Sequence, residues 1–237
     1  MMGAAAALTA RSASAAAERP CITELFTSQG CSSCPPADAF MTELRSMKDV
    51  IALTYNVDYW DYLGWRDTLA SPAHSQRQYD YAKARGDMDV YTPQLIVDGG
   101  SHYVGSNKAE VMAAIRRSLA STPSLWVPMS LTGNSTEVAI EIGASSAKTN
   151  LAATVWLVSV APEITVKIEK GENAGKDMIY YNVVRKLTPA GMWNGEAASL
   201  TMPREGVVSG DCKGGVALLQ LGSQGHIIGA STWGALS

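Results

Sequence analysis

Several features that mark large classes of function are missing from the sequence. There is no Lys- or Arg-rich run, and 19 basic against 22 acidic residues leave a net charge of −3, so the chain lacks a basic surface for nucleic acid phosphates. No uninterrupted apolar run reaches the roughly 18 residues that a membrane-spanning helix needs. Neither a glycine-rich phosphate loop nor a Gly-x-Ser-x-Gly motif occurs. With 46% hydrophobic and 17% charged residues, the composition is that of a globular protein of one or two domains.

Metal-binding residues are also scarce. The histidines His74, His102 and His226 stand far apart, and no His-x-x-x-His motif occurs. A single Cys-x-x-Cys motif supplies only two of the four ligands that a structural zinc site requires, and the sequence has no second copy. We therefore expect no metal and no cofactor, and we expect structural roles for His102 and His226.

Residues 1–20 are rich in alanine and serine and show no amphipathic pattern. The small residues Ala15, Ala16 and Ala17 before Glu18 are typical of a signal-peptidase site, although no Lys or Arg precedes the short apolar stretch. We interpret this segment as the remnant of a secretory signal peptide, with a disordered leader as the alternative. Export would place the protein in the periplasm or outside the cell, where disulfides persist.

Residues 21–122 alternate between strand and helix patterns. Short β-branched runs mark the strands, and apolar residues three and four positions apart mark a helical face after Pro35 and Pro36. The expected strands are 21–27, 50–57, 92–97 and 102–105, and the expected helices follow Pro36 and cover 75–85 and 107–119. The predicted order is βαβαββα, which is typical of an α/β domain.

The pattern changes after residue 122. Apolar and polar residues alternate along 136–142 and 164–169, as in strands with one buried face. Eight strand-like runs occur without a convincing helix, namely 125–131, 136–142, 151–160, 164–169, 178–187, 197–202, 216–221 and 226–233. We therefore predict a second, all-β domain over residues 123–237, arranged as a β-sandwich.

The motif Cys31-Ser32-Ser33-Cys34 stands between the first strand and the first helix. A helix N-terminus favours an anion, so we expect the pKa of Cys31 to lie below the ~8.5 of a free thiol. Cys34 follows one helical turn later, close enough to form a disulfide and to resolve a mixed disulfide. We predict Cys31 as the nucleophile and Cys34 as the resolving thiol. The alternatives are a purely structural disulfide and metal binding completed by another protein's ligands.

A second element of the predicted site is the pair Thr92-Pro93. A proline that follows threonine at the head of a strand is a candidate for a cis peptide bond. Such a bond would turn the Thr92 backbone toward the cysteines, where its carbonyl and amide can pair with an extended substrate. We therefore predict Pro93 as part of the catalytic site and Thr92 as a substrate-binding residue.

The loop after the second strand is rich in aromatic and acidic residues. It lies at the carboxyl end of a strand, where ligands bind in open α/β sheets. In one interpretation Asp58, Tyr59, Trp60 and Asp61 line a substrate groove beside the cysteines, and in the other the rings only cap the core. We also consider Asp58 or Asp61 as the acceptor of a proton from Cys34.

The two remaining cysteines stand alone in the sequence. Cys21 opens the first strand, and Cys212 lies in a loop of the second half. We expect a structural disulfide between them that joins the two halves, with two free thiols as the alternative.

Taken together, these motifs resemble known proteins. The first strand, the Cys-x-x-Cys corner, the Thr-Pro pair and the following hairpin are similar to a thioredoxin-like domain. The segment ELFTSQGCSSCPPAD (24–38), with segments 56–65, 91–99 and 181–185, resembles the DUF1223 family of bacterial proteins. The resemblance implies a thioredoxin-like fold and a secreted or periplasmic setting. Gly30 and Ser32-Ser33 differ from ordinary thioredoxins, which have Trp and Gly-Pro at these places, so the direction of redox transfer is not assigned.

The leading hypothesis from the sequence is an exported thiol–disulfide oxidoreductase that exchanges disulfides with protein or small-molecule thiols. Its β-sandwich would dock or space a partner. The alternative from another class is a non-catalytic binding protein with a structural disulfide. A third hypothesis is Cu(I) handling by the thiol pair, with Met88 as a further soft ligand.

Overall fold

The computed structural model describes residues 19–121, 125–147, 152–222, 224–234 and 236, so most of the expected signal segment lies outside the described residues. The first half contains strands and helices in the expected order βαβαββα, with a short 3-10 turn added after the second strand. These elements are β1 (Cys21–Thr27), α1 (Pro35–Ser46), β2 (Val50–Asn56), η1 (Asp61–Leu63), α2 (Pro72–Arg85), β3 (Gln94–Val97), β4 (His102–Val104) and α3 (Lys108–Ala120).

Local sequence signals fix the ends of these helices. α1 begins at Pro35, where the missing N–H of proline leaves no helical hydrogen bond unmade. The Ser71 side chain accepts a hydrogen bond from the Ala73 amide at the start of α2, and Gly86 ends that helix with a φ of 79°. Asn107 caps α3 in the same way as Ser71 caps α2.

The second half contains only strands among its described residues. They are β5 (Met129–Gly133), β6 (Glu137–Ile142), β7 (Ala153–Lys167), β8 (Asp177–Trp193), β9 (Ala198–Pro203), β10 (Gly214–Leu221) and β11 (Ile227–Gly234). The expected runs 151–160 and 164–169 belong to a single long strand, β7, which pairs with β8 in a long hairpin. The residues that connect them, 168–176, are called the hairpin tip below.

Strands from both halves share one sheet. Within the described residues, eight strands are hydrogen-bonded in the order β11-β10-β7-β8-β2-β1-β3-β4, and β5, β6 and β9 form a smaller sheet. β8 joins the first half by lying parallel to β2, and the Thr54 hydroxyl and the Asn182 amide reinforce this junction through carbonyls of the facing strand. The large sheet is therefore continuous across the expected division near residue 122, with four strands from each half joined at β2 and β8.

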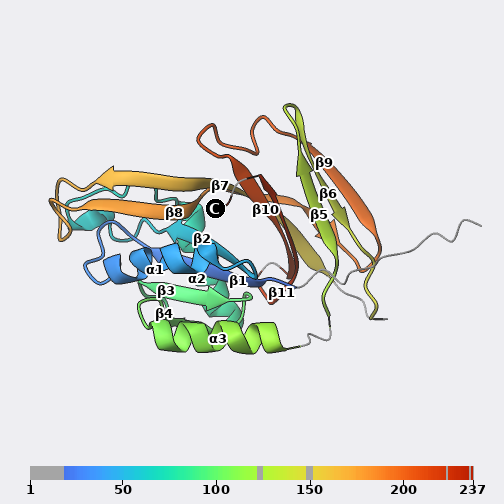
Figure 1. Ribbon diagram of the computed structural model, residues 1–237, viewed down its shortest axis with the longest axis horizontal. Coiled ribbons are helices and arrows are strands. Elements are labelled where there is room, and N and C mark those ends of the chain that lie inside the picture. Colours follow the sequence, from blue (N-terminus) through green and yellow to red (C-terminus); the bar gives the residue numbers. More distant parts are fainter. Residues whose placement is uncertain (1–18, 122–124, 148–151, 223, 235, 237) are drawn as a thin grey trace, which may run out of the picture.

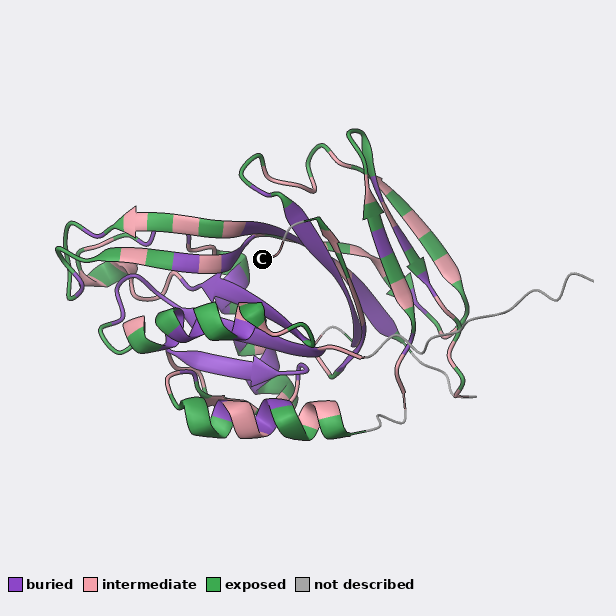
Figure 2. Ribbon diagram, in the orientation of Figure 1, coloured by how far each residue is buried: buried purple, intermediate pink, exposed green. Residues whose placement is uncertain are grey.

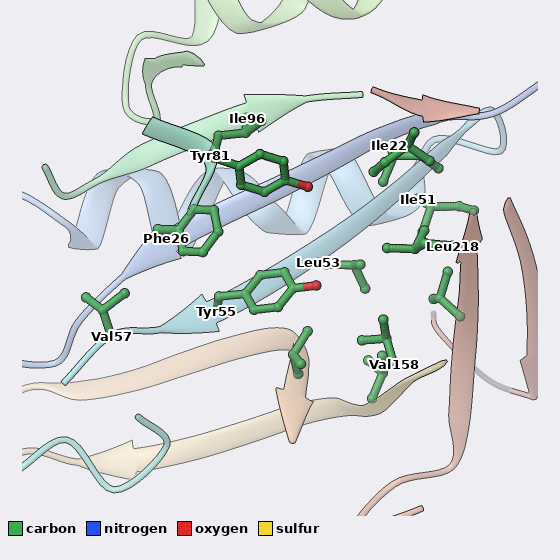
Figure 3. Close-up of a cluster of buried hydrophobic side chains, with 14 residues drawn as sticks. Ile22, Phe26, Ile51, Leu53, Tyr55, Val57, Tyr81, Ile96, Val158 and Leu218 are labelled. Atoms are coloured by element: carbon green, nitrogen blue, oxygen red, sulfur yellow. The ribbon is translucent and has the colours of Figure 1, made fainter. Parts of the chain in front are cut away.

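Helices and the smaller sheet cover the faces of the large sheet (Figure 1). α1 and α3 pack on one face of β1, β2 and β3, with Leu25, Phe40 and Ile115 among the buried contacts. The other face holds a second cluster, in which Phe26 and Tyr55 stack at 5.2 Å and meet Val158 and Leu218 from the second half (Figure 3). The smaller sheet packs against β7, β10 and β11 through a third cluster.

Burial is greatest where these layers meet. β1 and β2 are buried along their whole length, whereas β7 and β8 alternate mainly between half-buried and exposed residues toward the hairpin tip (Figure 2). The hairpin therefore extends beyond the helix-covered part of the sheet and reaches the loop that carries the Cys-x-x-Cys motif.

A buried charged cluster holds α2 against the sheet. The Arg77 guanidinium donates to the Glu24 carboxylate at 2.7 Å and to the Tyr81 hydroxyl at 2.8 Å, and the Tyr81 hydroxyl donates to the same carboxylate. Gln220 of β10 bonds to both Arg77 and Tyr81. Because α2 has few apolar residues, this network supplies much of its attachment to β1 and β10.

Candidate functional site

The Cys-x-x-Cys motif forms a disulfide at the corner between β1 and α1. Cys31 and Cys34 are bonded to each other, with their Cα atoms 5.4 Å apart. Cys34 is the N-cap of α1, and its carbonyl accepts the Ala37 and Asp38 amides at 2.8 and 3.1 Å. Cys31 is 3% exposed and Cys34 is fully buried, so a reactant that approaches from outside meets Cys31 first. The free N–H groups of the first helical turn favour negative charge at this position.

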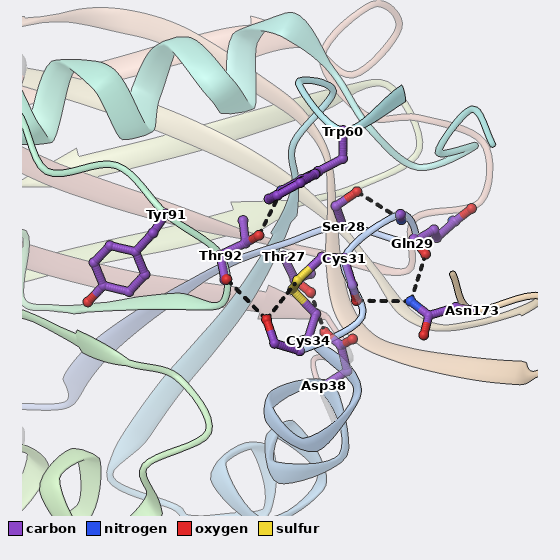
Figure 4. The surroundings of a disulfide bond; sticks show 12 residues. Thr27, Ser28, Gln29, Cys31, Cys34, Asp38, Trp60, Tyr91, Thr92 and Asn173 are labelled. Atoms are coloured by element: carbon purple, nitrogen blue, oxygen red, sulfur yellow. Dashed lines mark hydrogen bonds between the residues drawn. A yellow bond between two sulfur atoms is a disulfide. The ribbon is translucent and has the colours of Figure 1, made fainter. Parts of the chain in front are cut away.

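The Thr92–Pro93 peptide bond is cis, as expected from the sequence. The Thr92 carbonyl lies 3.4 Å from the Ser33 hydroxyl, and the same hydroxyl lies 3.4 Å from the Cys31 sulfur (Figure 4). The Thr92 side chain accepts a hydrogen bond from the Trp60 indole at 2.8 Å. The residues expected from three separate segments therefore meet around the disulfide.

Four aromatic rings extend from this point along the surface, and we call them the aromatic row. They are Tyr79, Tyr59, Trp60 and Tyr62, with successive ring centres 6.4, 6.0 and 6.4 Å apart. Tyr59 and Trp60 are half-buried against the core, and Tyr62 is 77% exposed. The inner rings therefore cap the core, as the second interpretation expects, and the outer rings face solvent.

The two acids of this loop are engaged in hydrogen bonds within their own region. The Asp58 carboxylate accepts from the Ser75 hydroxyl at 2.5 Å, and the Asp61 carboxylate accepts from the Asp67 amide at 2.9 Å. These bonds stabilise the turn around η1 and its contact with α2. Neither bond involves a cysteine.

A carboxyl that sequence reasoning missed lies closer to Cys34. Asp38 is one helical turn further along α1 and is buried beside the disulfide (Figure 4). One of its oxygens accepts from the Thr27 hydroxyl at 2.7 Å, and the other has no hydrogen-bond partner among the described residues. Burial raises the pKa of Asp38 to about 8. The signal was the spacing Cys34-x-x-x-Asp38, which places an acid four positions after a cysteine on one helix.

The loop that precedes Cys31 is held by hydrogen bonds from two other segments of the chain. The Asp67 carboxylate accepts the Gln29 amide at 2.7 Å, and the Trp65 indole donates to the Gln29 side chain at 2.8 Å. The Asn173 amide of the hairpin tip donates to the carbonyls of Gln29 and Cys31, both at 2.9 Å. Asn173 was not singled out in the sequence because it is far from the motif and its own neighbours carry no recognisable pattern.

The expected disulfide between Cys21 and Cys212 is wrong. Both are free thiols among the described residues, and burial is the main cause that raises the pKa of each, to about 12 for Cys21. Cys21 packs under α1 and α3, whereas the Cys212 sulfur lies 3.0 Å from the Ser159 hydroxyl of β7. β2 and β8 separate β1 from β7, so about 14 Å of sheet lies between them, twice the Cα separation that a disulfide spans.

The ring nitrogens of His74 and His102 lie within hydrogen-bond distance of nearby groups. His74 is buried, its Nδ1 lies 2.9 Å from the Asn56 carbonyl, and burial lowers its pKa to about 4. His102 Nδ1 lies 2.9 Å from the Tyr91 hydroxyl. Across the described part of the chain, no three His, Cys, Asp or Glu side chains are grouped so as to hold a metal ion. No helix of the same part combines the length and apolar character needed to cross a membrane.

Fold and site together define a mixed α/β protein that carries a Cys-x-x-Cys disulfide at a strand-to-helix corner. More particularly, the chain belongs to the DUF1223 family of proteins of unknown function, whose model matches residues 22–220. It is similar to the crystal structure of protein AGR_C_4864 from Agrobacterium tumefaciens, with 36% identity, a TM-score of 0.73, and coverage of 91% of this chain and 94% of that one.

A second solved structure shares the fold at lower sequence similarity. HBP35 of Porphyromonas gingivalis is 15% identical, with a TM-score of 0.61 over 91% of this chain and 74% of that one. A comparison with curated proteins gave no match.

Proposed function

We propose that this protein is a thiol–disulfide oxidoreductase that exchanges disulfides with polypeptide substrates after export. The single observation that carries the proposal is the meeting of the Cys31–Cys34 pair, at a helix N-terminus, with the cis Thr92–Pro93 bond. A helix N-terminus stabilises a thiolate, and the Thr92 carbonyl lies 3.4 Å from the hydroxyl of Ser33, which stands between the two cysteines. The Ala-rich segment with its small-residue cleavage pattern supports export, where a disulfide of this kind persists.

The proposed exchange conserves sulfur, protons and electrons. In the reduced protein, the Cys31 thiolate attacks a substrate disulfide, forms a mixed disulfide and releases one substrate thiolate. Cys34 then loses its proton and attacks the Cys31 sulfur, which closes the Cys31–Cys34 bond and releases the second substrate thiolate. Two electrons pass from the protein dithiol to the substrate, and the reverse sequence oxidises a substrate dithiol.

Asp38 is proposed as the acceptor of the Cys34 proton. It lies on the same side of α1 as Cys34, and its unpartnered oxygen is buried with it. A carboxyl with a pKa of about 8 holds and releases a proton in the range in which thiols titrate. The acids proposed from the sequence, Asp58 and Asp61, accept hydrogen bonds from Ser75 and Asp67 instead.

The substrate is proposed to bind in an extended form along Thr92. The present partner of the Thr92 carbonyl is the exposed Ser33 hydroxyl at 3.4 Å, a long hydrogen bond that a substrate amide can replace. Tyr59 and Trp60 then form the inner wall of the binding surface, and Tyr62 extends it outward. Aromatic rings of this kind bind apolar side chains of a polypeptide at a small entropic cost.

The finer description of the fold belongs to the same proposal. We propose that β1, α1, β2, β3, β4 and α3 form a thioredoxin-like unit, supported by the parallel β1–β2 pair with α1 between them and the antiparallel β3 after the cis proline. The smaller sheet and the strands it covers are proposed as a sandwich-like extension that docks or spaces a partner.

A structural disulfide in a binding protein is the second candidate function. The observation that favours it is the low exposure of both cysteines, 3% and 0%, which restricts access by a substrate. The two candidates differ in the redox equilibrium of the pair and in the reactivity of Cys31.

The deciding experiment measures the reduction potential of the pair in glutathione and dithiothreitol buffers and follows Cys31 alkylation against pH. A potential between about −270 and −120 mV, with a Cys31 thiolate below about pH 7.5, supports exchange. A potential below about −300 mV with an unreactive Cys31 rejects exchange in favour of the structural disulfide. Tight stoichiometric Cu(I) binding by the reduced protein would instead favour the copper-handling hypothesis.

A further inference from the structure

The hairpin tip buries one polar side chain, that of Asn173. The Ile168 amide donates to the Lys176 carbonyl at 3.0 Å, and the Gly175 amide donates to the Ile168 carbonyl at 2.8 Å, which closes the tip as a compact turn. Most of its residues are exposed, yet Asn173 is only 1% exposed. The turn therefore presents Asn173 to the loop that carries Cys31, 142 residues earlier in the chain.

Every hydrogen-bonding atom of the Asn173 amide group has a partner. Its nitrogen donates to the Gln29 and Cys31 carbonyls, both at 2.9 Å, and its oxygen accepts from the Lys176 ammonium at 2.8 Å (Figure 4). The reverse orientation of the amide would face an oxygen toward two carbonyl oxygens and its nitrogen toward a cation. The orientation is therefore fixed, and the side chain acts as a donor to both carbonyls.

One of these carbonyls also sets the spacing of the two cysteines. The Cys31 carbonyl accepts the Cys34 amide at 3.3 Å, which closes the turn between them. Asn173 thus holds the same oxygen that defines the turn in which the disulfide forms. Asp67 and Trp65 also fix Gln29, so residues 29–31 are held by two segments distant in the chain, and we call these hydrogen bonds the clamp.

This clamp acts differently on the two redox states. In the oxidised protein the sulfur–sulfur bond itself restrains the loop. In the reduced protein that restraint is gone, and the hydrogen bonds from Asn173 remain to keep the loop in the conformation that brings the two sulfurs together. Preorganisation of this kind raises the effective concentration of one reacting group at the other.

We propose that Asn173 is a positioning residue that raises the effective concentration of the Cys34 thiol at Cys31 and so favours the disulfide over the dithiol. The relevant equilibrium is the reduction of the Cys31–Cys34 disulfide by two thiols of a reductant, which yields the protein dithiol and the oxidised reductant. Two electrons and two protons are transferred to the protein sulfurs. The disulfide–dithiol equilibrium is a property of the protein itself. The inference therefore rests on the proposed function only where it assigns this equilibrium a role in disulfide exchange.

The test uses the full chain and its Asn173→Ala and Asn173→Asp variants, equilibrated in buffers of reduced and oxidised dithiothreitol. Asn173→Asp keeps the side-chain volume and removes both N–H donors. We expect the equilibrium constant for disulfide formation to fall about tenfold in both variants, which corresponds to a potential about 30 mV less negative. Glu172→Ala is the matched control, because Glu172 is the exposed neighbour of Asn173 in the same turn, and it leaves the potential unchanged.

A merely structural role gives a different result. It lowers the thermal stability of the oxidised and reduced forms by the same amount and leaves the potential where it was, and that outcome overturns the inference. The proposed role instead lowers the stability of the oxidised form more than that of the reduced form. If Asn173→Ala does not fold, Lys176→Met removes the bond that fixes the amide and is expected to shift the potential in the same direction by less.

Failure of the proposed function is recognised separately. A shifted potential in the Asn173 variants, with no exchange between any form of the protein and a polypeptide disulfide, rejects the oxidoreductase and keeps the positioning role. Rapid exchange, with the same reduction potential in the wild type and all variants, supports the oxidoreductase and rejects the positioning role of Asn173.

Discussion

The two ends of β1 each bring a cysteine into the fold, and they give it opposite properties. At the start of the strand, Cys21 is packed beneath α1 and α3, and burial raises its pKa to about 12. Just beyond the other end, Cys31 is joined to Cys34 at a helix N-terminus, with the cis Thr92–Pro93 bond beside it. The two cysteines therefore differ in surroundings: Cys21 lies in the core, whereas Cys31 lies at a helix N-terminus, where free N–H groups favour a thiolate.

The largest effect is expected when the cysteine at each end of β1 is replaced in turn. Cys31→Ser should lower the rate of disulfide exchange by at least about three orders of magnitude, because a serine hydroxyl is a poor nucleophile at neutral pH. Cys21→Ala should leave the rate within about twofold. The measurement is the rate of reduction of a small disulfide by each reduced variant. Equal losses in the two variants would contradict the assignment of the site to one end of the strand.

The middle of β1 is expected to affect stability rather than chemistry. Arg77→Met leaves the Glu24 carboxylate buried without its cation and should lower the free energy of unfolding by about 3–5 kcal/mol. Urea unfolding measures this loss, and the double variant Arg77→Met with Glu24→Gln should recover part of it. The exchange rate per folded molecule should not change. A slower reaction in the folded fraction would show that the charged cluster extends its influence to the cysteines.

Asp38, near the Cys31 end of β1, makes the stability of the protein depend on pH in the neutral range, which Cys21 at the other end does not. Its folded pKa of about 8 lies above the ~3.9 of the unfolded chain, so the folded protein retains a proton that the unfolded chain has lost. The contribution of this group to stability is complete below about pH 4 and is lost as the pH rises through about 8. Asp38→Asn should flatten this fall and be more stable than the wild type at pH 9.

The same variant tests the proton-transfer role. Removing the acceptor should slow the resolution of the mixed disulfide by Cys34 about tenfold, while the first attack by Cys31 is little changed. Rapid mixing with a chromogenic disulfide separates the two steps. If the stability of the wild type and of Asp38→Asn depends on pH in the same way, the raised pKa of Asp38 is refuted. If only the rate of the resolution step is unchanged, its role in proton transfer alone is refuted.

The smallest effect is expected at the outer end of the aromatic row. Tyr62→Ala should raise the KM for a polypeptide substrate about two- to fivefold, because one exposed ring contributes a fraction of the binding energy, and leave exchange with glutathione disulfide unchanged. Met192→Ala is the control, since Met192 is a similarly exposed apolar residue of β8. An equal effect of the two substitutions would show that the aromatic row has no special place in binding.

Features encoded by neighbouring residues were predictable from the sequence. The strand and helix order of the first half follows from short-range periodicity, prolines and caps, and Thr92–Pro93 was expected in the cis form from its place before β3. The Cys31–Cys34 disulfide follows from spacing alone, because two intervening residues at a helix N-terminus bring the sulfurs together.

Features that depend on distant pairing were not predictable in the same way. Nothing in the local pattern of β8 indicates that it lies beside β2, so the sequence did not predict that strands on both sides of residue 122 share one sheet. The predicted Cys21–Cys212 disulfide was wrong for the same reason. The pairing of β2 with β8 places both strands between β1 and β7, and so keeps the two cysteines apart. Asp38 was missed because its significance depends on burial, which the helix pattern around it suggested only indirectly.

The parallel contact of β8 with β2 also imposes an order of events during synthesis. The residues of β1, α1 and β2 leave the ribosome more than 100 residues before those of β8, so the nascent chain carries the Cys-x-x-Cys motif next to an unpaired sheet edge. Asn173, in the tip just before β8, arrives equally late. Until then the cysteines stand in a loop that only one of its two clamps can hold, and the edge of β2 is open to pairing with other chains. The β7–β8 hairpin therefore protects two features at once, the strand edge of β2 and the conformation of the cysteine loop.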